Sequence, residues 1–177
     1  MSIKSKQLFI LIGDDRTGKT TLQKLLIEKI CGHGYTRLPT NLPFAIIHPE
    51  IKRKYQNISF GNRSYQEKIV DYISVDNYFQ NHFQAADIAF TSSHLSVSDI
   101  QQMINNGHIR FYNVTGIFWT NSISNSQNGN SQISLLNWDE RLIIENPTSE
   151  DNNIIEKQLN SIADNIVFFI ANRTHNS

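Results

Sequence analysis

Several features are scarce in this 177-residue chain, and each scarcity excludes a class of protein. Cys31 is the only cysteine, which excludes an intrachain disulfide and a multi-cysteine zinc site and fits a reducing compartment. Lys and Arg total 16, as do Asp and Glu, so no net charge attracts the chain to nucleic acid or an anionic membrane. No apolar run approaches the ~18 residues of a membrane span, and no signal-peptide cleavage site follows Lys4 and Lys6. We therefore expect one cytoplasmic domain over residues 1–177, with neither a membrane nor nucleic acid as a partner.

Apolar runs typical of buried strands alternate with stretches that have the spacing of amphipathic helices. The runs predict strands at residues 7–12, 86–91, 111–119 and 142–144, with a short strand or strand end at residues 35–39. The spacing predicts helices at about residues 22–30, 64–83, 96–107 and 151–169. Such alternation implies right-handed crossovers between parallel strands. We therefore expect an α/β fold of three layers, a parallel sheet with helices on both faces.

Two polar stretches interrupt this pattern. Residues 51–62 are polar and contain the adjacent cations Lys52, Arg53 and Lys54, which indicates a solvated loop or a helix end. Residues 121–134, NSISNSQNGNSQIS, consist largely of Asn, Ser, Gln and Gly and have little to bury. We expect this second tract to be a mobile loop.

The strongest chemical signal is the segment Gly13–Thr20, GDDRTGKT, which fits the phosphate-binding pattern G-x-x-x-x-G-K-[ST]. It stands between a buried strand and a helix, the context in which such loops occur. The backbone N–H groups of such a loop surround phosphates, Lys19 adds positive charge at the outer phosphates, and the Thr20 hydroxyl can reach Mg²⁺. We therefore expect a P-loop NTPase fold that binds ATP and Mg²⁺ through six residues: Gly13, Thr17, Gly18, Lys19, Thr20 and Thr21.

The segment GDDRTGKTTLQKLL resembles the G-x-D-R-x-G-K-[ST]-T-Q segment of thymidylate kinases, and Arg37-Leu38-Pro39 resembles the Arg-x-Pro element of that family. The similarity covers roughly residues 7–39. It implies that Asp15 contacts the sugar hydroxyl of an acceptor nucleotide, that Arg16 stabilises the transferring phosphoryl group, and that Arg37 holds the acceptor phosphate. An arginine suits these roles because its planar fork can hold two oxygens at once. Two alternatives stay open: Asp15 and Arg16 pair with each other, and Arg37 is a solvated surface residue.

The second half of the chain departs from the thymidylate kinase pattern. After the strand at residues 86–91 the family has Asp-Arg and an aromatic residue, whereas this chain has Ser92-Ser93-His94. Ser92 could hold a metal-bound water and His94 could contact a phosphate, or the two could be a capping serine and a structural histidine. The polar tract at residues 121–134 lies where nucleotide kinases have their lid, yet it contains no Lys or Arg. Arg141 is the nearest cation that could reach a substrate.

Two functions fit these observations. The first is a small kinase that transfers the γ-phosphoryl group of ATP to a nucleotide or nucleoside-like acceptor, with Lys19 and Arg16 as catalytic residues. The second is a kinase-derived module that binds or slowly hydrolyses a nucleoside triphosphate and thereby regulates a partner. The paired Asp15 and Arg16, with Arg37, favour the first function. The segment Ser92–His94 and the uncharged lid favour the second. The sequence leaves the acceptor and a homodimer open.

Overall fold

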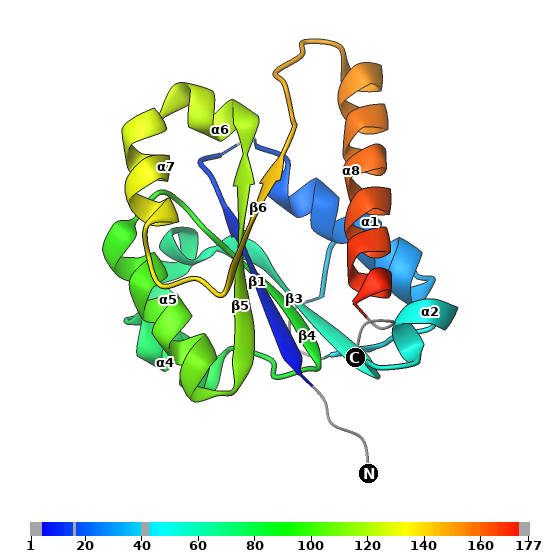
Figure 1. The fold of residues 1–177 in the computed structure, drawn as a ribbon, viewed down its shortest axis with the longest axis horizontal. Coiled ribbons are helices and arrows are strands. Elements are labelled where there is room, and N and C mark those ends of the chain that lie inside the picture. The colour runs from blue at the N-terminus through cyan, green and yellow to red at the C-terminus, as the bar shows by residue number, and fades with distance from the viewer. Residues whose placement is uncertain (1–4, 16, 40–42, 174–177) are drawn as a thin grey trace.

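A six-stranded sheet lies at the centre of the computed structural model (Figure 1), which describes residues 5–15, 17–39 and 43–173, apart from the side chain of Asn62. The strand order is β2-β3-β4-β1-β5-β6. All neighbouring strands are parallel except β2, which pairs antiparallel with β3 at one edge. The strands are β1 (Lys6–Ile12), β2 (Phe44–Ala45), β3 (Asn57–Ser64), β4 (Ile88–Ser93), β5 (Tyr112–Trp119) and β6 (Glu140–Ile144). The protein therefore has an α/β architecture with a mostly parallel, mixed sheet.

Helices pack against both faces of this sheet (Figure 1). One face is covered by α1 (Lys19–Cys31), α2 (Pro49–Lys52) and α8 (Asn152–Asn172). The helices that contribute to the core on the other face are the 3₁₀ helix η1 (Tyr65–Lys68), α3 (Ile69–Tyr72), α4 (Val75–Asn81), α5 (Val97–Ile109), α6 (Thr120–Asn125) and α7 (Gln127–Ser134). Within the described segments, none of the helices has both the length and the apolar character that crossing a membrane requires.

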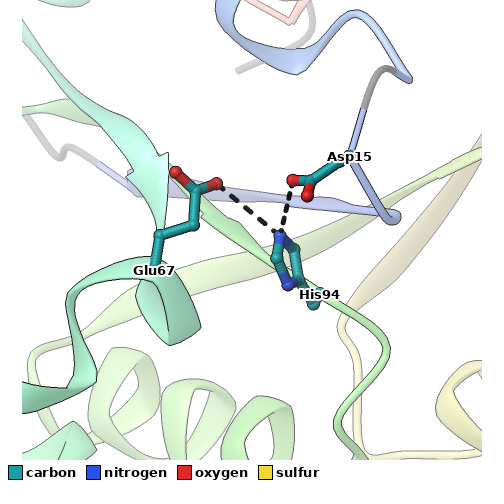
Figure 2. A group of neighbouring side chains, drawn as sticks. All are labelled: Asp15, Glu67 and His94. Carbon is teal, nitrogen blue, oxygen red and sulfur yellow. Dashed lines mark ion pairs between the residues drawn. The ribbon is translucent and has the colours of Figure 1, made fainter.

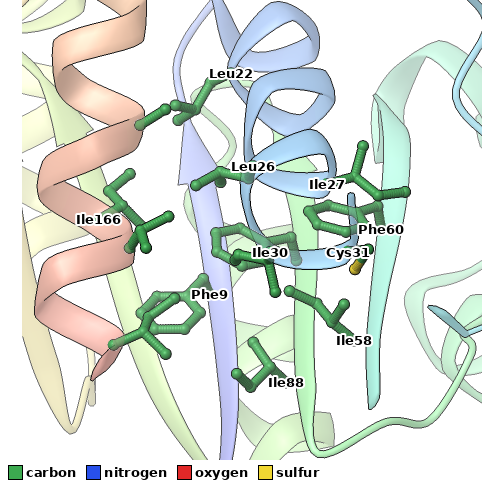
Figure 3. Close-up of a cluster of buried hydrophobic side chains, with 14 of the residues drawn as sticks. Phe9, Leu22, Leu26, Ile27, Ile30, Cys31, Ile58, Phe60, Ile88 and Ile166 are labelled. Atoms are coloured by element: carbon green, nitrogen blue, oxygen red, sulfur yellow. The ribbon is translucent and has the colours of Figure 1, made fainter. Parts of the chain in front are cut away.

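The central strand β1 is buried on both faces, which explains why its sequence is an unbroken apolar run. Leu8 and Ile10 pack toward the α5 side, whereas Phe9 packs toward α1 and α8. Figure 3 shows the second of these cores, in which Leu26 and Ile30 of α1 lie beside Phe9. These side chains recur at helical spacing and form the apolar face of α1. Burial of this face against the sheet holds the start of α1 at the end of β1.

Most of the predicted elements are confirmed. The apolar runs form β1, β4, β5 and β6, and the first and last predicted helices are α1 and α8. Ser96 caps α5 by accepting a hydrogen bond from the Asp99 N–H, and Asp151 caps α8 by accepting one from the Asn153 N–H. The short polar side chains that suggested these helix starts therefore act as caps.

Of two predictions between α1 and β4, one is wrong and one is confirmed only in part. Residues 35–39 form an irregular loop and no strand. The polar stretch at residues 51–62 is predicted to be a loop or helix end, which is confirmed for residues 51–56, where α2 ends at Lys52, but residues 57–62 belong to β3, which pairs with β4. Ile58 and Phe60 are buried within β3, and Ser59 donates a hydrogen bond to the Gln84 carbonyl oxygen. Two apolar residues were too few to give a strand signal.

Two further predictions fail because backbone breaks and tertiary contacts outweigh the local pattern. Residues 64–83 do not form one long helix: Ser64 belongs to β3, and η1, α3 and α4 follow, with a break at Ile73, whose φ is 67°. Ile73 is exposed instead of buried. The tract at residues 121–134 is helical, not a loop, and forms most of α6 and all of α7. Its mobility stays a prediction.

Candidate functional site

The loop between β1 and α1 lies at the carboxyl edge of the sheet, where ligands bind in parallel α/β proteins. Ile12, the last residue of β1, pairs in register with Ser93, and Ser64 pairs with Ser92, so the ends of β1, β3 and β4 are level. A cavity of about 290 Å³ opens at this edge. Its lining consists of Asp15, Thr17, Gly18, Lys19, Thr20, Thr21, Ser64, Glu67, Ser92, Ile155 and Leu159.

A larger hollow, of about 750 Å³, lies between β6 and α8. Its lining includes aliphatic side chains such as Leu142, Ile144 and Ile166, and among the described residues it contains two charged ones, Glu145 and Lys157. The smaller cavity gathers hydroxyls, carboxylates and an ammonium group from three segments of the chain. Polar groups that converge from separate segments mark a binding site better than volume does, so we place the candidate site at the smaller cavity.

Lys19, the first residue of α1, turns its ammonium group back into the loop. The side chain is buried, and Nζ donates hydrogen bonds to the carbonyl oxygens of Gly13 at 2.5 Å and Asp14 at 2.6 Å, and to Thr17 Oγ1 at 3.2 Å. Burial lowers the pKa of Lys19, and the carboxylates of Asp15, Glu67 and Asp14 partly oppose that effect. The ammonium group of Lys19 lies at the N-terminus of α1, and an anion is favoured at a helix N-terminus.

The turn before α1 requires glycine. Gly18 has a φ of 95°, and a Cβ atom there would lie 2.9 Å from Leu159 Cδ2 in α8. Asn146, which follows β6, is buried and donates a hydrogen bond from Nδ2 to the Thr17 carbonyl oxygen at 2.9 Å. Gln158 of α8 in turn donates to Asn146 Oδ1. The loop is therefore held by α8 and by the segment after β6, a role that the sequence did not reveal for Asn146.

Three ionisable side chains meet beside the loop (Figure 2). His94 Nε2 lies 3.2 Å from Asp15 Oδ1 and 3.6 Å from Glu67 Oε1. Gln66 holds two of the contributing segments together, because its Oε1 accepts a hydrogen bond from the His94 N–H at 2.9 Å and its Nε2 donates to Asp99 Oδ2 at 2.8 Å. Sequence reasoning missed Glu67, because it falls within residues 64–83, for which one long helix was predicted. The structure brings the Glu67 carboxylate to the cavity from η1.

The structure brings most of the expected site residues together. Of those expected to bind the cofactor, metal or acceptor, Asp15, Thr17, Gly18, Lys19, Thr20, Thr21 and Ser92 line the cavity, and the carbonyl of Gly13 accepts a hydrogen bond from Lys19. Ser92 is buried and accepts a hydrogen bond from Gln23 Nε2 at 3.1 Å. His94 lies outside the lining that the described residues form, and its Nε2 faces the carboxylates of Asp15 and Glu67, so its contact with a phosphate stays a prediction.

Of the three predicted arginines, the two that the structure describes lie outside the lining of this cavity. Arg37 is exposed and lies outside the lining defined by the described residues. Arg141 is also exposed and donates hydrogen bonds to the carbonyl oxygens of Ser134 and Leu136 at the end of α7. Arg16 lies outside the described residues, so its catalytic role and its pairing with Asp15 stay predictions.

Comparisons with known proteins gave no match, neither to a family model nor to a curated protein or a solved structure. The resemblance to thymidylate kinases therefore stays a prediction that rests on the loop motif and the Arg37–Pro39 segment. The chemistry of the site has to be argued from its own geometry.

Proposed function

We propose that the protein binds ATP with Mg²⁺ at the Gly13–Thr20 loop and transfers the γ-phosphoryl group to a nucleotide or nucleoside-like acceptor. The observation that supports this most is the position of Lys19, whose ammonium group is bound by the loop carbonyls at the start of a helix. A phosphate that enters the cavity would meet this charge together with the first N–H groups of α1. The class of protein proposed is a P-loop phosphotransferase.

The cavity also offers the oxygen ligands that Mg²⁺ prefers. The hydroxyls of Thr20 and Ser92 both belong to the lining, and such groups bind Mg²⁺ directly or through water. The ion would neutralise charge on the transferring phosphoryl group. Lys19 would hold the outer phosphates, and the loop N–H groups would orient them for in-line attack.

A second function, hydrolysis of a nucleoside triphosphate by a regulatory module, is favoured by one observation. In the part of the chain that the structure describes, Lys19 is the only Lys or Arg in the cavity lining. Transfer between two phosphates needs positive charge on both, because the donor and acceptor phosphates repel each other. If Arg37 does not move to the cavity, water is the acceptor that this site suits best.

Both functions require binding of ATP with Mg²⁺, and calorimetry tests this binding. Lys19→Ala should weaken binding by roughly ten- to a hundredfold, because a charged hydrogen bond contributes ~1.5–3 kcal/mol. Lys24→Ala is the matched control, since Lys24 also lies in α1 but donates to the Thr36 carbonyl oxygen away from the loop. Equal affinities in the wild type and a folded Lys19→Ala variant would exclude this nucleotide site.

The product then decides between the two functions. ATP and Mg²⁺ are incubated with a panel of nucleosides and nucleoside monophosphates, and phosphorylated acceptor and free phosphate are measured separately. A kinase forms phosphorylated acceptor in excess of free phosphate. A hydrolytic module releases phosphate at a rate that no acceptor changes.

A further inference from the structure

The proposed phosphoryl transfer does not explain why Asp15, Glu67 and His94 meet one another, although the resemblance implies a substrate contact for Asp15. The three donor atoms of this cluster lie within 4.8 Å of one another, although they come from the loop after β1, from η1 and from the end of β4 (Figure 2). His94 Nε2 is shielded from solvent and makes no hydrogen bond of good geometry within the described part of the chain. A buried imidazole nitrogen that faces two carboxylates without such a bond calls for a physical explanation.

The distances suit shared ligation of a metal better than an ordinary ion pair. A charge-assisted N–H···O bond is typically about 2.8 Å long, and an N–H that two acceptors share makes a longer and less well aligned bond to each. In contrast, with metal–ligand bonds of about 2.0–2.2 Å, neighbouring ligands are separated by ~3.0 Å in an octahedron and ~3.5 Å in a tetrahedron. The observed separations of 3.2 and 3.6 Å from Nε2 to the two carboxylates fall in or close to this range.

The donor set also indicates which metals the cluster would bind. One imidazole and two carboxylates suit borderline cations such as Zn²⁺, Co²⁺ and Mn²⁺, whereas Mg²⁺ prefers oxygen ligands alone. Three protein ligands leave coordination positions for water or another ligand. Gln66 fixes the backbone of His94 relative to η1, so two of the three ligands are held in place before any metal arrives.

We infer that the nucleotide-free protein binds one divalent transition-metal ion through Asp15 Oδ1, Glu67 Oε1 and His94 Nε2. Asp15 and Glu67 also line the cavity that contains Lys19, so the ion would lie at the edge of the proposed phosphate site. This site differs from the magnesium site proposed above in its ligands and in needing no nucleotide. The inference therefore stands or falls apart from the proposed function.

Calorimetry of the nucleotide-free protein with Zn²⁺ tests the site, and the absorption spectrum of the Co²⁺-loaded protein reports the ligands. We expect one ion per chain, bound more tightly than Mg²⁺. His94→Ala should weaken Zn²⁺ binding at least ~10-fold and change the Co²⁺ spectrum. His108→Ala is the matched control. His108 Nε2 also faces a carboxylate, lying 3.0 Å from Asp139 Oδ2, but this pair lies outside the proposed metal site. The His108→Ala variant should leave the affinity unchanged.

A second variant guards against misfolding. Glu67→Gln keeps the shape of the side chain and removes its charge, so it should also weaken Zn²⁺ binding while thermal unfolding stays cooperative. The inference is overturned if wild-type protein binds no Zn²⁺, or if His94→Ala and His108→Ala bind it equally well. Lys19→Ala separates the two proposals, because it should weaken ATP binding roughly ten- to a hundredfold and leave Zn²⁺ binding intact.

Discussion

Burial changes the acid–base behaviour of individual side chains in this protein. Cys31, at the end of α1, is 1% exposed, and burial raises the pKa of its thiol from 9.0 to about 12. Burial likewise raises the pKa of Tyr78 to about 12, although its hydroxyl shares a hydrogen bond with Thr91 Oγ1. Each shift links protonation to the stability of the fold.

Cys31 should make the fold less stable as the pH rises. The thiol of the unfolded chain ionises above pH 9.0, whereas the folded protein keeps this proton until pH is about 12. Rising pH therefore favours unfolding over this interval, and Cys31 contributes a loss of roughly 1 kcal/mol between about pH 8 and about pH 10. Cys31→Val has a similar volume and cannot ionise, so the variant should lose that much less. Urea unfolding at both pH values under reducing conditions measures this difference, and equal losses in the two proteins would contradict it.

At the scale of elements, a few inward-facing residues make the polar tract at residues 121–134 helical. Asn130 is buried, and its Nδ2 donates to the carbonyl oxygens of Ser122 at 3.2 Å and Ser126 at 2.8 Å, which joins α6 to α7. Ile133 is fully buried, and its carbonyl oxygen accepts a hydrogen bond from Trp138 Nε1. The composition of the tract does not reveal these contacts, because they depend on residues outside it and on the packing of the helix.

Asn130→Ala should therefore destabilise the protein by ~1–3 kcal/mol, because it removes two hydrogen bonds of a buried amide across the α6–α7 junction, although both carbonyl oxygens keep a backbone N–H donor. Asn128→Ala provides a close control, since Asn128 lies two residues away in the same helix and is exposed. That variant should stay within about 0.5 kcal/mol of the wild type. Urea unfolding compares the three proteins, and similar stabilities for both variants would mean that Asn130 does not hold the junction.

At the scale of the whole molecule, the fold depends on how closely helices approach the sheet. Gly107 lies in α5 against β5 and β1, and a Cβ atom there would be 2.6 Å from Val114 Cγ2 and 2.9 Å from Leu8 Cδ2. Both contacts are shorter than packed atoms tolerate. The absence of a side chain at Gly107 therefore sets the distance between α5 and the sheet.

Gly107→Ala should push α5 away from the sheet. Overpacking of a core costs ~1–3 kcal/mol, and the higher helix propensity of alanine returns up to about 1 kcal/mol, so a net loss of stability is expected. Gly34→Ala is the control, because a Cβ atom at Gly34 meets nothing within 4 Å. Thermal unfolding of both variants measures the effect. A stabilised Gly107→Ala protein would show that a methyl group fits between α5 and the sheet.

The sequence by itself determined the elements whose burial leaves a continuous or periodic pattern. The strands β1 and β5 lie at the centre of the sheet, so their residues are apolar on both faces, and α1 and α8 carry a regular apolar stripe. The pattern at Gly13–Thr20 was equally easy to recognise, because its residues are contiguous, and its binding of a nucleotide stays a prediction. The local sequence was therefore enough to predict these elements.

Only the tertiary structure decided the rest. β3 has little apolar pattern of its own and is a strand because β4 offers it partners, and α7 is helical because its few buried side chains meet the rest of the protein. Glu67 reaches His94 because Ser64 and Ser92 are paired in register, which brings the segments after β3 and β4 to the same edge of the sheet. Contacts between residues far apart in the chain depend on register and packing, and these depend on every strand at once.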